Sequence, residues 1–148
     1  MVILRRADPS DSQILWEWRN DTDARSASRE TRAVPWGDHE RWYRASLASP
    51  ARLILIAVDE NATRMGMVRF DFDDSDSASV SINVAPDHRG KGMGQRLLHA
   101  AIIYVRANHP ALKLVAQIRT SNAPSTRIFE REGFARVSET DGIVTLRA

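Results

Sequence analysis

The sequence contains no cysteine, no long apolar run and no histidine spacing typical of a metal site. The absence of cysteine excludes disulfides, thiolate catalysis and cysteine-ligated metal, and it leaves the redox compartment open. A membrane helix needs roughly 20 apolar residues, and no stretch approaches that length. The apolar residues 2–4 stop at Arg5, which is too early for a signal peptide. We therefore expect a cytoplasmic protein with no metal and no membrane partner.

The chain also lacks a strong excess of charge of one sign. Its formal net charge is +2, and its arginines are scattered along the sequence. A nucleic-acid-binding protein more often shows a clustered basic stripe with interleaved aromatic residues, so we expect no nucleic-acid partner. The 148 residues, of which 43% are hydrophobic, suit a single domain over 1–148, without a linker or an internal repeat.

A glycine-rich stretch in residues 83–98 is the most informative segment. A β-rich run stops at Pro86, Gly90, Gly92 and Gly94 alternate with other residues, and an apolar helical pattern follows. A helix N-terminus offers unpaired backbone N–H groups and a positive dipole end, and glycines let a phosphate approach them closely. This layout predicts a site for a phosphorylated ligand, although the glycines could also serve only to form a surface turn.

The glycine spacing excludes two familiar phosphate loops. A P-loop needs Gly-x-x-x-x-Gly-Lys-Ser/Thr, and a dinucleotide fingerprint needs Gly-x-Gly-x-x-Gly early in the chain; neither is present. The observed Arg-Gly-Lys-Gly-Met-Gly resembles the pyrophosphate-binding loop of the GNAT superfamily of acyl-CoA-dependent N-acyltransferases. Residues 118–134 resemble a later motif of the same superfamily, in which an Asn (here Asn122) begins a short helix that ends at Gly-Phe (here Gly133-Phe134).

The pattern of apolar residues predicts the order β-α-α-β-β-β-α-β-α-β-β, which matches the GNAT arrangement over the whole chain. We expect strands at 2–5, 53–58, 65–72, 79–84, 112–118, 134–137 and 143–146. We expect helices from Asp8, from Pro35, after the glycine loop to about Asn108, and over 124–132, with a polar connection over 21–34 and a hairpin connection over 73–76. The fold class is α/β, with a mixed, mostly antiparallel sheet that carries helices on both faces. The cofactor cleft should lie where the strands of Val84 and Val115 part.

The GNAT resemblance implies acetyl-CoA as the acyl donor. It implies that the glycine loop holds the pyrophosphate, that Asn122 contacts the pantetheine arm, and that Phe129 packs beside the thiol end. Asn122 and Ser125 could also serve only as helix-capping residues. The implied cofactor-binding residues are Asn83, Val84, Arg89, Gly90, Lys91, Gly92, Met93, Gly94, Gln95, Asn122, Ser125 and Phe129.

The same resemblance implies that the backbone N–H of Val84 or Ala85 polarises the thioester carbonyl. Many GNAT members place a Tyr where this chain has Phe129, and that Tyr protonates the leaving thiolate. Phe129 cannot do so, but an alkyl thiol with a pKa near 8.5 can leave as the thiolate. The general base is expected among Glu17, Asp71, Asp73 and His39, with Glu17 and Asp71 preferred, although each could be an ordinary solvated or ion-paired side chain.

The acceptor half is expected in the tryptophan-rich first third of the chain. We expect Trp16, Arg19, Trp36 and His39 to bind the acceptor, whereas Trp18 and Trp42 are expected in the core. The segment 15–21 is similar to a GNAT branch that acetylates nucleotide-activated amino sugars or protein N-termini. The favoured acceptor is therefore an amino sugar. The alternatives are a protein N-terminus or a non-catalytic CoA-binding module, and exposed C-terminal strands could pair two subunits into a homodimer.

Overall fold

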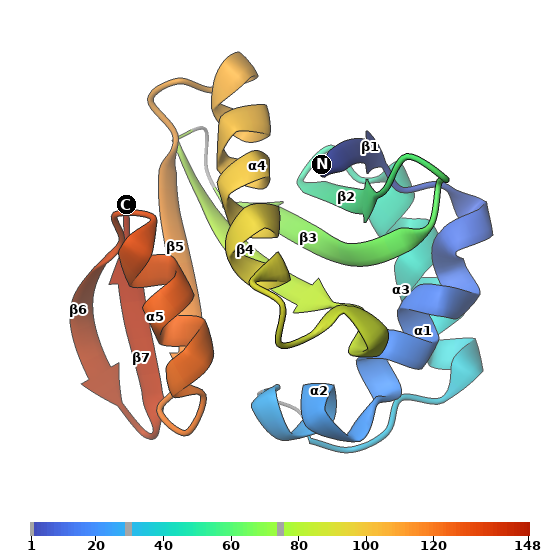
Figure 1. Cartoon of the computed structure of the whole chain (residues 1–148), viewed down its shortest axis with the longest axis horizontal. Coiled ribbons are helices and arrows are strands. Elements are labelled where there is room, and N and C mark those ends of the chain that lie inside the picture. The colour runs from blue at the N-terminus through green and yellow to red at the C-terminus, as the bar shows by residue number, and fades with distance from the viewer. Residues whose placement is uncertain (1, 29–30, 74–75) are drawn as a thin grey trace.

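The computed structural model describes residues 2–28, 31–73 and 76–148. One seven-stranded sheet has the order β1-β2-β3-β4-β5-β7-β6, and only the β4–β5 pair is parallel (Figure 1). The strands are β1 (Ile3–Arg6), β2 (Arg52–Val58), β3 (Arg64–Phe72), β4 (Ser77–Val84), β5 (Lys113–Arg119), β6 (Ala135–Thr140) and β7 (Ile143–Arg147). The helices are α1 (Ser12–Asn20), α2 (Thr22–Ala27), α3 (Trp36–Ala48), α4 (Met93–Asn108) and α5 (Ala123–Arg131), with the short 3-10 helices η1 (Pro9–Asp11) and η2 (Pro86–His88).

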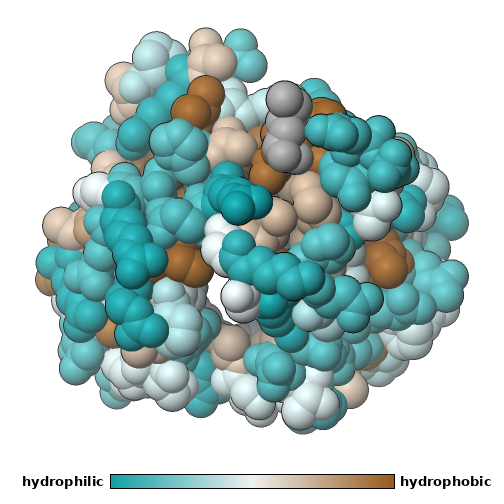
Figure 2. Space-filling model, viewed as in Figure 1, coloured by the Kyte–Doolittle hydropathy of each residue, from teal (hydrophilic) through white to brown (hydrophobic). Residues whose placement is uncertain are grey.

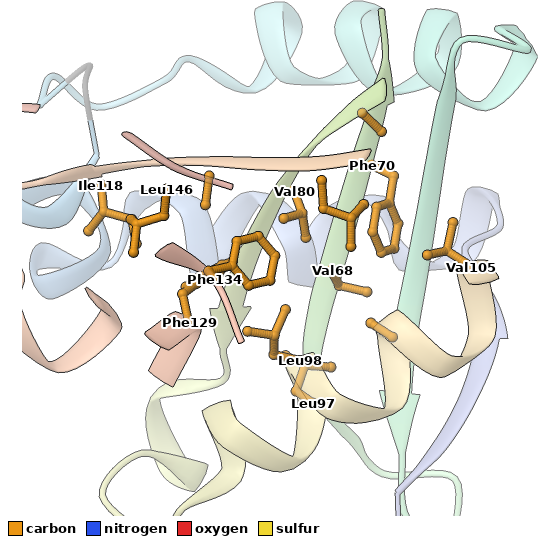
Figure 3. Close-up of a cluster of buried hydrophobic side chains, with 14 of the residues drawn as sticks. Val68, Phe70, Val80, Leu97, Leu98, Val105, Ile118, Phe129, Phe134 and Leu146 are labelled. Atoms are coloured by element: carbon orange, nitrogen blue, oxygen red, sulfur yellow. The ribbon is translucent and has the colours of Figure 1, made fainter. Parts of the chain in front are cut away.

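The sheet separates two hydrophobic clusters because both faces of its central strands are apolar. Leu55 and Val68 lie in the cluster beneath α4 and α5, whereas Ile54 and Ile56 lie in the cluster beneath α1 and α3. Alternate residues of a strand point to opposite faces, so the continuous apolar run of β2 supplies both clusters. Figure 3 shows the first cluster, in which Phe129 of α5 lies close to Phe134. The predicted mixed sheet with helices on both faces is confirmed.

The start of α1 is built by a capping box that the sequence already indicates. The Asp8 side chain accepts a hydrogen bond from the Ser10 N–H at 2.8 Å, and Asp11 accepts one from the Asp8 N–H at 2.8 Å. These bonds satisfy backbone donors that a helix start leaves unpaired. The predicted helix therefore begins where expected, with one 3-10 turn ahead of the α-helix.

Strands β4 and β5 pair only over a short stretch at one end. Their register joins Ser77–Ser79 to Lys113–Val115, and beyond Ser79 the two strands diverge. The remaining length of β4 is paired with β3 on one edge only. The prediction that the strands of Val84 and Val115 part from each other is confirmed.

Within the described residues, three α-helices and the short η1 precede β2, whereas two helices were predicted. The additional helix α2 lies inside the expected polar connection, and Asp21 caps it by accepting from the N–H groups of Asp23 and Ala24. Its six residues carry no apolar period, so nothing but the cap marks it in the sequence. The predicted hairpin connection at 73–76 lies partly outside the described residues. Within the described ranges, no helix is long and apolar enough to cross a membrane.

Candidate active site

The end of β4 presents one backbone N–H to the gap left by β5. Ala85 donates its N–H to the Met65 carbonyl at 2.9 Å, so this group is already used. Neighbouring residues of an antiparallel ladder direct their N–H and C=O groups to opposite edges, which points those of Val84 away from β3. Consistently, the Val84 carbonyl accepts from the Arg89 guanidinium at 3.1 Å rather than from β3. Of the two backbone N–H groups predicted to be catalytic, that of Ala85 is therefore excluded. That of Val84 faces the unpaired edge of β4.

The Arg89 side chain joins the end of β4 to the residue that precedes α2. It donates to Asp21 at 2.6 Å and to Asn83 at 3.4 Å in addition to Val84. The hydrogen bond from Arg89 lowers the pKa of Asp21 below its usual value. The Arg89 guanidinium therefore connects the α1–α2 junction to the end of β4, and the predicted contact of Arg89 with the pyrophosphate stays a prediction.

The glycine loop forms an uncapped helix start. Gly90 and Gly92 have φ values of 76° and 72°, in the left-handed region that favours glycine, and Gly92 is the N-cap of α4 without any side-chain cap. The Arg96 N–H donates to the Gly92 carbonyl at 3.3 Å, so the N–H groups of the three residues before it, Met93 to Gln95, have no partner within the helix. Exposed Lys91 adds positive charge nearby. These groups fit a pyrophosphate, as the predicted cofactor loop requires.

Gly94 and Gln95 of the loop also make contacts between α4 and α5. A Cβ on Gly94 would lie 2.9 Å from the Cδ1 atom of Ile128, so a larger residue there would make the Ile128 side chain shift where α4 packs on α5. The Gln95 side chain donates to Glu132 at 2.5 Å and to the Ile128 carbonyl at 3.3 Å. The side-chain N–H groups of Gln95 are therefore used, its buried Oε1 atom has no partner among the described residues, and its backbone N–H is left to contact a ligand.

A cleft of about 390 Å³ opens beside the free edge of β4, between α5 on one side and α1, α2 and α3 on the other. Figure 2 shows a largely hydrophilic face that is hollowed near its centre, between the segments that Figure 1 shows as α5 and the loop after β4. Residues 80–83 of β4 form part of its lining. The lining also includes these predicted site residues: Asn83, Asn122, Ser125 and Phe129 on the cofactor side, and Arg19 and His39 on the acceptor side.

On the cofactor side, Asn122 both caps α5 and lines the cleft. Its Oδ1 atom accepts from the Ser125 N–H at 3.3 Å, which leaves its side-chain amide free to donate. Phe129 is only 2% exposed and packs edge-on against Phe134, with ring centroids 5.0 Å apart. The ring of Phe129 is therefore an apolar wall of the cleft, without a proton to give.

On the acceptor side, one ring nitrogen of His39 makes a hydrogen bond and the other has no partner among the described residues. Its Nε2 atom lies 2.9 Å from the Ser12 carbonyl, which can only accept, so Nε2 carries the hydrogen. Its Nδ1 atom is buried and has no hydrogen-bond partner among the described residues. Burial lowers the pKa of His39 from 6.5, and the charge of Arg19 adds to this effect. His39 is thus held as a neutral imidazole whose buried Nδ1 lone pair has no partner among the described residues.

The other predicted bases and aromatic acceptor residues lie elsewhere. Glu17 is exposed and, with Trp16, lines a separate hollow between α1 and η2. Asp71 is ion-paired with Arg52 and Arg69, and it does not line the cleft. The sequence favoured Glu17 and Asp71 as the general base, but neither lines the cleft. Glu17 is an exposed side chain, and Asp71 forms ion pairs within the fold.

The tryptophans that line the cleft also differ from those predicted. Trp16 donates to the Val34 carbonyl at 2.8 Å and meets Trp36 edge-on at 5.4 Å, and neither lines the cleft. Trp42 packs against the core cluster beneath α1 and α3, as expected, and it also lines the cleft. Sequence reasoning missed Trp42 because an aromatic residue on a helical stripe is more often a core residue. It also missed Arg69, although an arginine within an apolar strand, next to a carboxylate at 71, was the available signal.

Comparisons with known proteins agree with this geometry. The model of the acetyltransferase (GNAT) domain family matches residues 1–135. The chain is 30% identical, over 95% of its length and 92% of the relative, to a Bacillus subtilis protein named "Putative phosphinothricin acetyltransferase YwnH". Its structure resembles spermidine N-acetyltransferase from Vibrio cholerae in complex with CoA and spermine, with a TM-score of 0.88, 19% identity and coverage of 99% and 94% of the two chains.

A further likeness concerns the donor. YncA from Salmonella typhimurium with its cofactor acetyl-CoA is 25% identical, with a TM-score of 0.78 and coverage of 100% of this chain and 93% of YncA. The uncapped glycine helix and the open edge of β4 supply the groups that such a donor needs. The chain belongs to the GNAT acetyltransferase family, and it is an acyltransferase that uses acetyl-CoA.

Proposed function

We propose that this protein moves the acetyl group of acetyl-CoA to the nitrogen of a primary amine bound beside Trp42 and His39. The observation that carries the proposal is the divergence of β4 from β5, which leaves the Val84 N–H on the unpaired edge of β4, next to residues 80–83 that line the cleft. Acetyl-CoA supplies an acyl group activated as a thioester. The backbone N–H groups at the start of α4 hold its pyrophosphate, and Asn122 donates to the amide-rich pantetheine arm.

The Val84 N–H serves as the donor that stabilises negative charge on the carbonyl oxygen. A fixed backbone N–H of this kind needs no reorganisation during the reaction, and removing one such donor in other enzymes costs about 10²–10³ in rate. Phe129 keeps the neighbourhood of the thiol apolar, and the thiol leaves without a proton from this residue.

His39 accepts the proton that the amine loses. Of the four candidate bases, it is the one that lines the cleft, and its free Nδ1 atom is the lone pair that a base requires. Its pKa below 6.5 keeps this nitrogen unprotonated at neutral pH. Its stacking on Tyr43, with centroids 5.7 Å apart, and the bond to Ser12 hold the ring in place.

The variant His39→Gln tests this role, because the glutamine amide can still donate to the Ser12 carbonyl but offers no basic nitrogen. We expect kcat to fall by about 10²-fold, the lower end for general base catalysis, and the acidic limb of the pH profile to disappear. The exposed His99 of α4 gives a control, His99→Gln, which should keep both. An unchanged pH profile in His39→Gln would exclude His39 as the base.

The finer identity of the acceptor is tested by thiol release from acetyl-CoA across a panel of amines. The nucleotide-activated amino sugar, our favoured acceptor from the sequence, enters the panel although Trp16 and Trp36, which motivated it, lie outside the cleft. Peptide N-termini, phosphinothricin and spermidine enter as the alternatives. We expect thiol release with a small primary amine. Silence with every amine, despite binding of acetyl-CoA, would overturn the proposed function.

A further inference from the structure

The acceptor half of the cleft is lined by positive charge. Arg19 of α1 and Arg69 of β3 both line it, together with Arg32 and Arg119, and the described residues of the lining include no Asp or Glu. The chain as a whole is nearly balanced, at +2. The acceptor site is therefore much more basic than the protein that surrounds it.

Trp42 lies close to three guanidinium groups, two of which line the cleft. Those of Arg19, Arg69 and Arg52 lie 5.2, 5.3 and 5.7 Å from its ring centroid. Cations at such distances are attracted by the ring. The indole of Trp42 thus holds basic side chains from α1, β2 and β3 in one place.

Among the described residues, a single carboxylate pairs with this cluster, and it reaches two of the three cations. Asp71 pairs with Arg52 at 3.2 Å and with Arg69 at 3.1 Å, whereas Arg19 makes no ion pair with any described residue. Burial, followed by the charge of Arg69, lowers the pKa of Arg19. The three arginine side chains are partly exposed to solvent, and the cluster keeps an excess of positive charge whose mutual repulsion a bound anion would relieve.

We infer that the acceptor amine carries an anionic group, a carboxylate or a phosphate-type oxyanion, that binds to Arg19 and Arg69 against Trp42. The inference rests on the proposed acetyl transfer and specifies its substrate class. The donor's pyrophosphate does not account for the cluster, because the residues that fit it, at the start of α4, do not line this cleft. A polyamine is disfavoured, because its several ammonium groups would meet arginines of the same sign.

Matched amines test the charge requirement directly. L-2-aminobutyrate and 1-aminopropane share a carbon skeleton and differ by the carboxylate, and glucosamine 6-phosphate and glucosamine differ by the phosphate. We expect kcat/KM to be at least about 10-fold higher for the anionic member of one pair, as a charge-assisted hydrogen bond provides. The pair that responds distinguishes an amino acid from a sugar phosphate. Equal kcat/KM within both pairs, or a preference for spermidine, would overturn the inference.

Arg19→Gln should abolish the preference for the anionic member, and Arg19→Lys should restore part of it because lysine keeps the charge. Arg44→Gln is the control, since Arg44 is an exposed residue of α3 that does not line the cleft. A preference that survives in a folded Arg19→Gln would contradict the assignment. Thiol release with neutral amines alone would overturn the inference but leave the proposed acetyl transfer standing.

Discussion

Gly92 is the residue on which the donor site depends most directly, because its left-handed backbone turns the loop into α4. A Cβ there would meet no atom within 4 Å, so the cost of Gly92→Ala is conformational, about 1 kcal/mol. Strain at this position displaces the N–H groups that we propose to hold the pyrophosphate. We therefore expect a several-fold rise in the KM for acetyl-CoA, measured by thiol release at saturating amine.

Gly142 provides the matched control for Gly92. It has a φ of 76° in the β6–β7 hairpin, and its Cβ position is equally open. Gly142→Ala should therefore cost similar stability and leave the KM for acetyl-CoA unchanged. The same rise in KM in both variants would show that general destabilisation, not the anion site, is responsible.

Which residue faces the cleft could be predicted only in part. Asn122, Ser125 and Phe129 line it as the motif implies, because a motif marks residues whose backbone the fold places identically. The choice between Val84 and Ala85 could not be made, since it depends on the register between β3 and β4. Residues that act through side chains from distant segments, such as Trp42 and Arg69, carry no local signal for their meeting.

At the scale of elements, Asp11 joins the start of α1 to two strands. Its carboxylate accepts from Arg5 of β1 at 2.7 and 2.8 Å and from Arg64 of β3 at 2.7 Å. Burial alone would raise its pKa, but the hydrogen bonds from Arg5, the Asp8 N–H and Arg64 lower it from 3.8 to about 2. The carboxylate therefore holds the edge of the sheet to the helix that carries Arg19.

The lowered pKa of Asp11 predicts how stability depends on pH. A group whose folded pKa lies below its unfolded value stabilises the fold above the unfolded value, and this is lost as pH falls between 3.8 and about 2. The difference corresponds to about 2 kcal/mol in the free energy of unfolding. Asp11→Asn should lose about that much at pH 7 and show less acid dependence in this window, measured by urea unfolding.

The exposed Asp38 gives the comparison for Asp11. It pairs with Arg41 within one turn of α3, and both side chains are more than half exposed. An exposed pair contributes little, so Asp38→Asn should change the free energy of unfolding by less than about 1 kcal/mol. If Asp11→Asn were equally mild, the buried network would have no special role.

The elements themselves were largely predictable, with one instructive exception. Long periodic segments such as α4 and alternating or fully apolar strands such as β2 follow from the order of apolar residues. Helix α2 does not, because its six residues bury no side chain of their own and owe their conformation to the Asp21 cap. Yet Ala24 and Ala27 of α2 line the cleft, so the missed helix forms part of the acceptor side.

At the scale of the whole molecule, the divergence of two strands in one sheet creates both halves of the site. The β4 edge and α5 form the donor side, whereas α1 to α3 approach from the other face (Figure 1), and the arginine cluster comes from α1, β2 and β3. The likeness to spermidine N-acetyltransferase, at 19% identity, concerns this shared framework. The local charge around Trp42 is a property of this chain's side chains, and it leads us to a different class of amine.

The product of the reaction tests the account most directly. The protein is incubated with acetyl-CoA and each amine of the matched pairs, and the same sample is analysed by thiol titration and by mass spectrometry. The account predicts an acetyl group on the nitrogen of an anionic amine, with one CoA released for each product molecule. Release of CoA without an acetylated amine, or acetyl-CoA that stays intact with every amine, would contradict it.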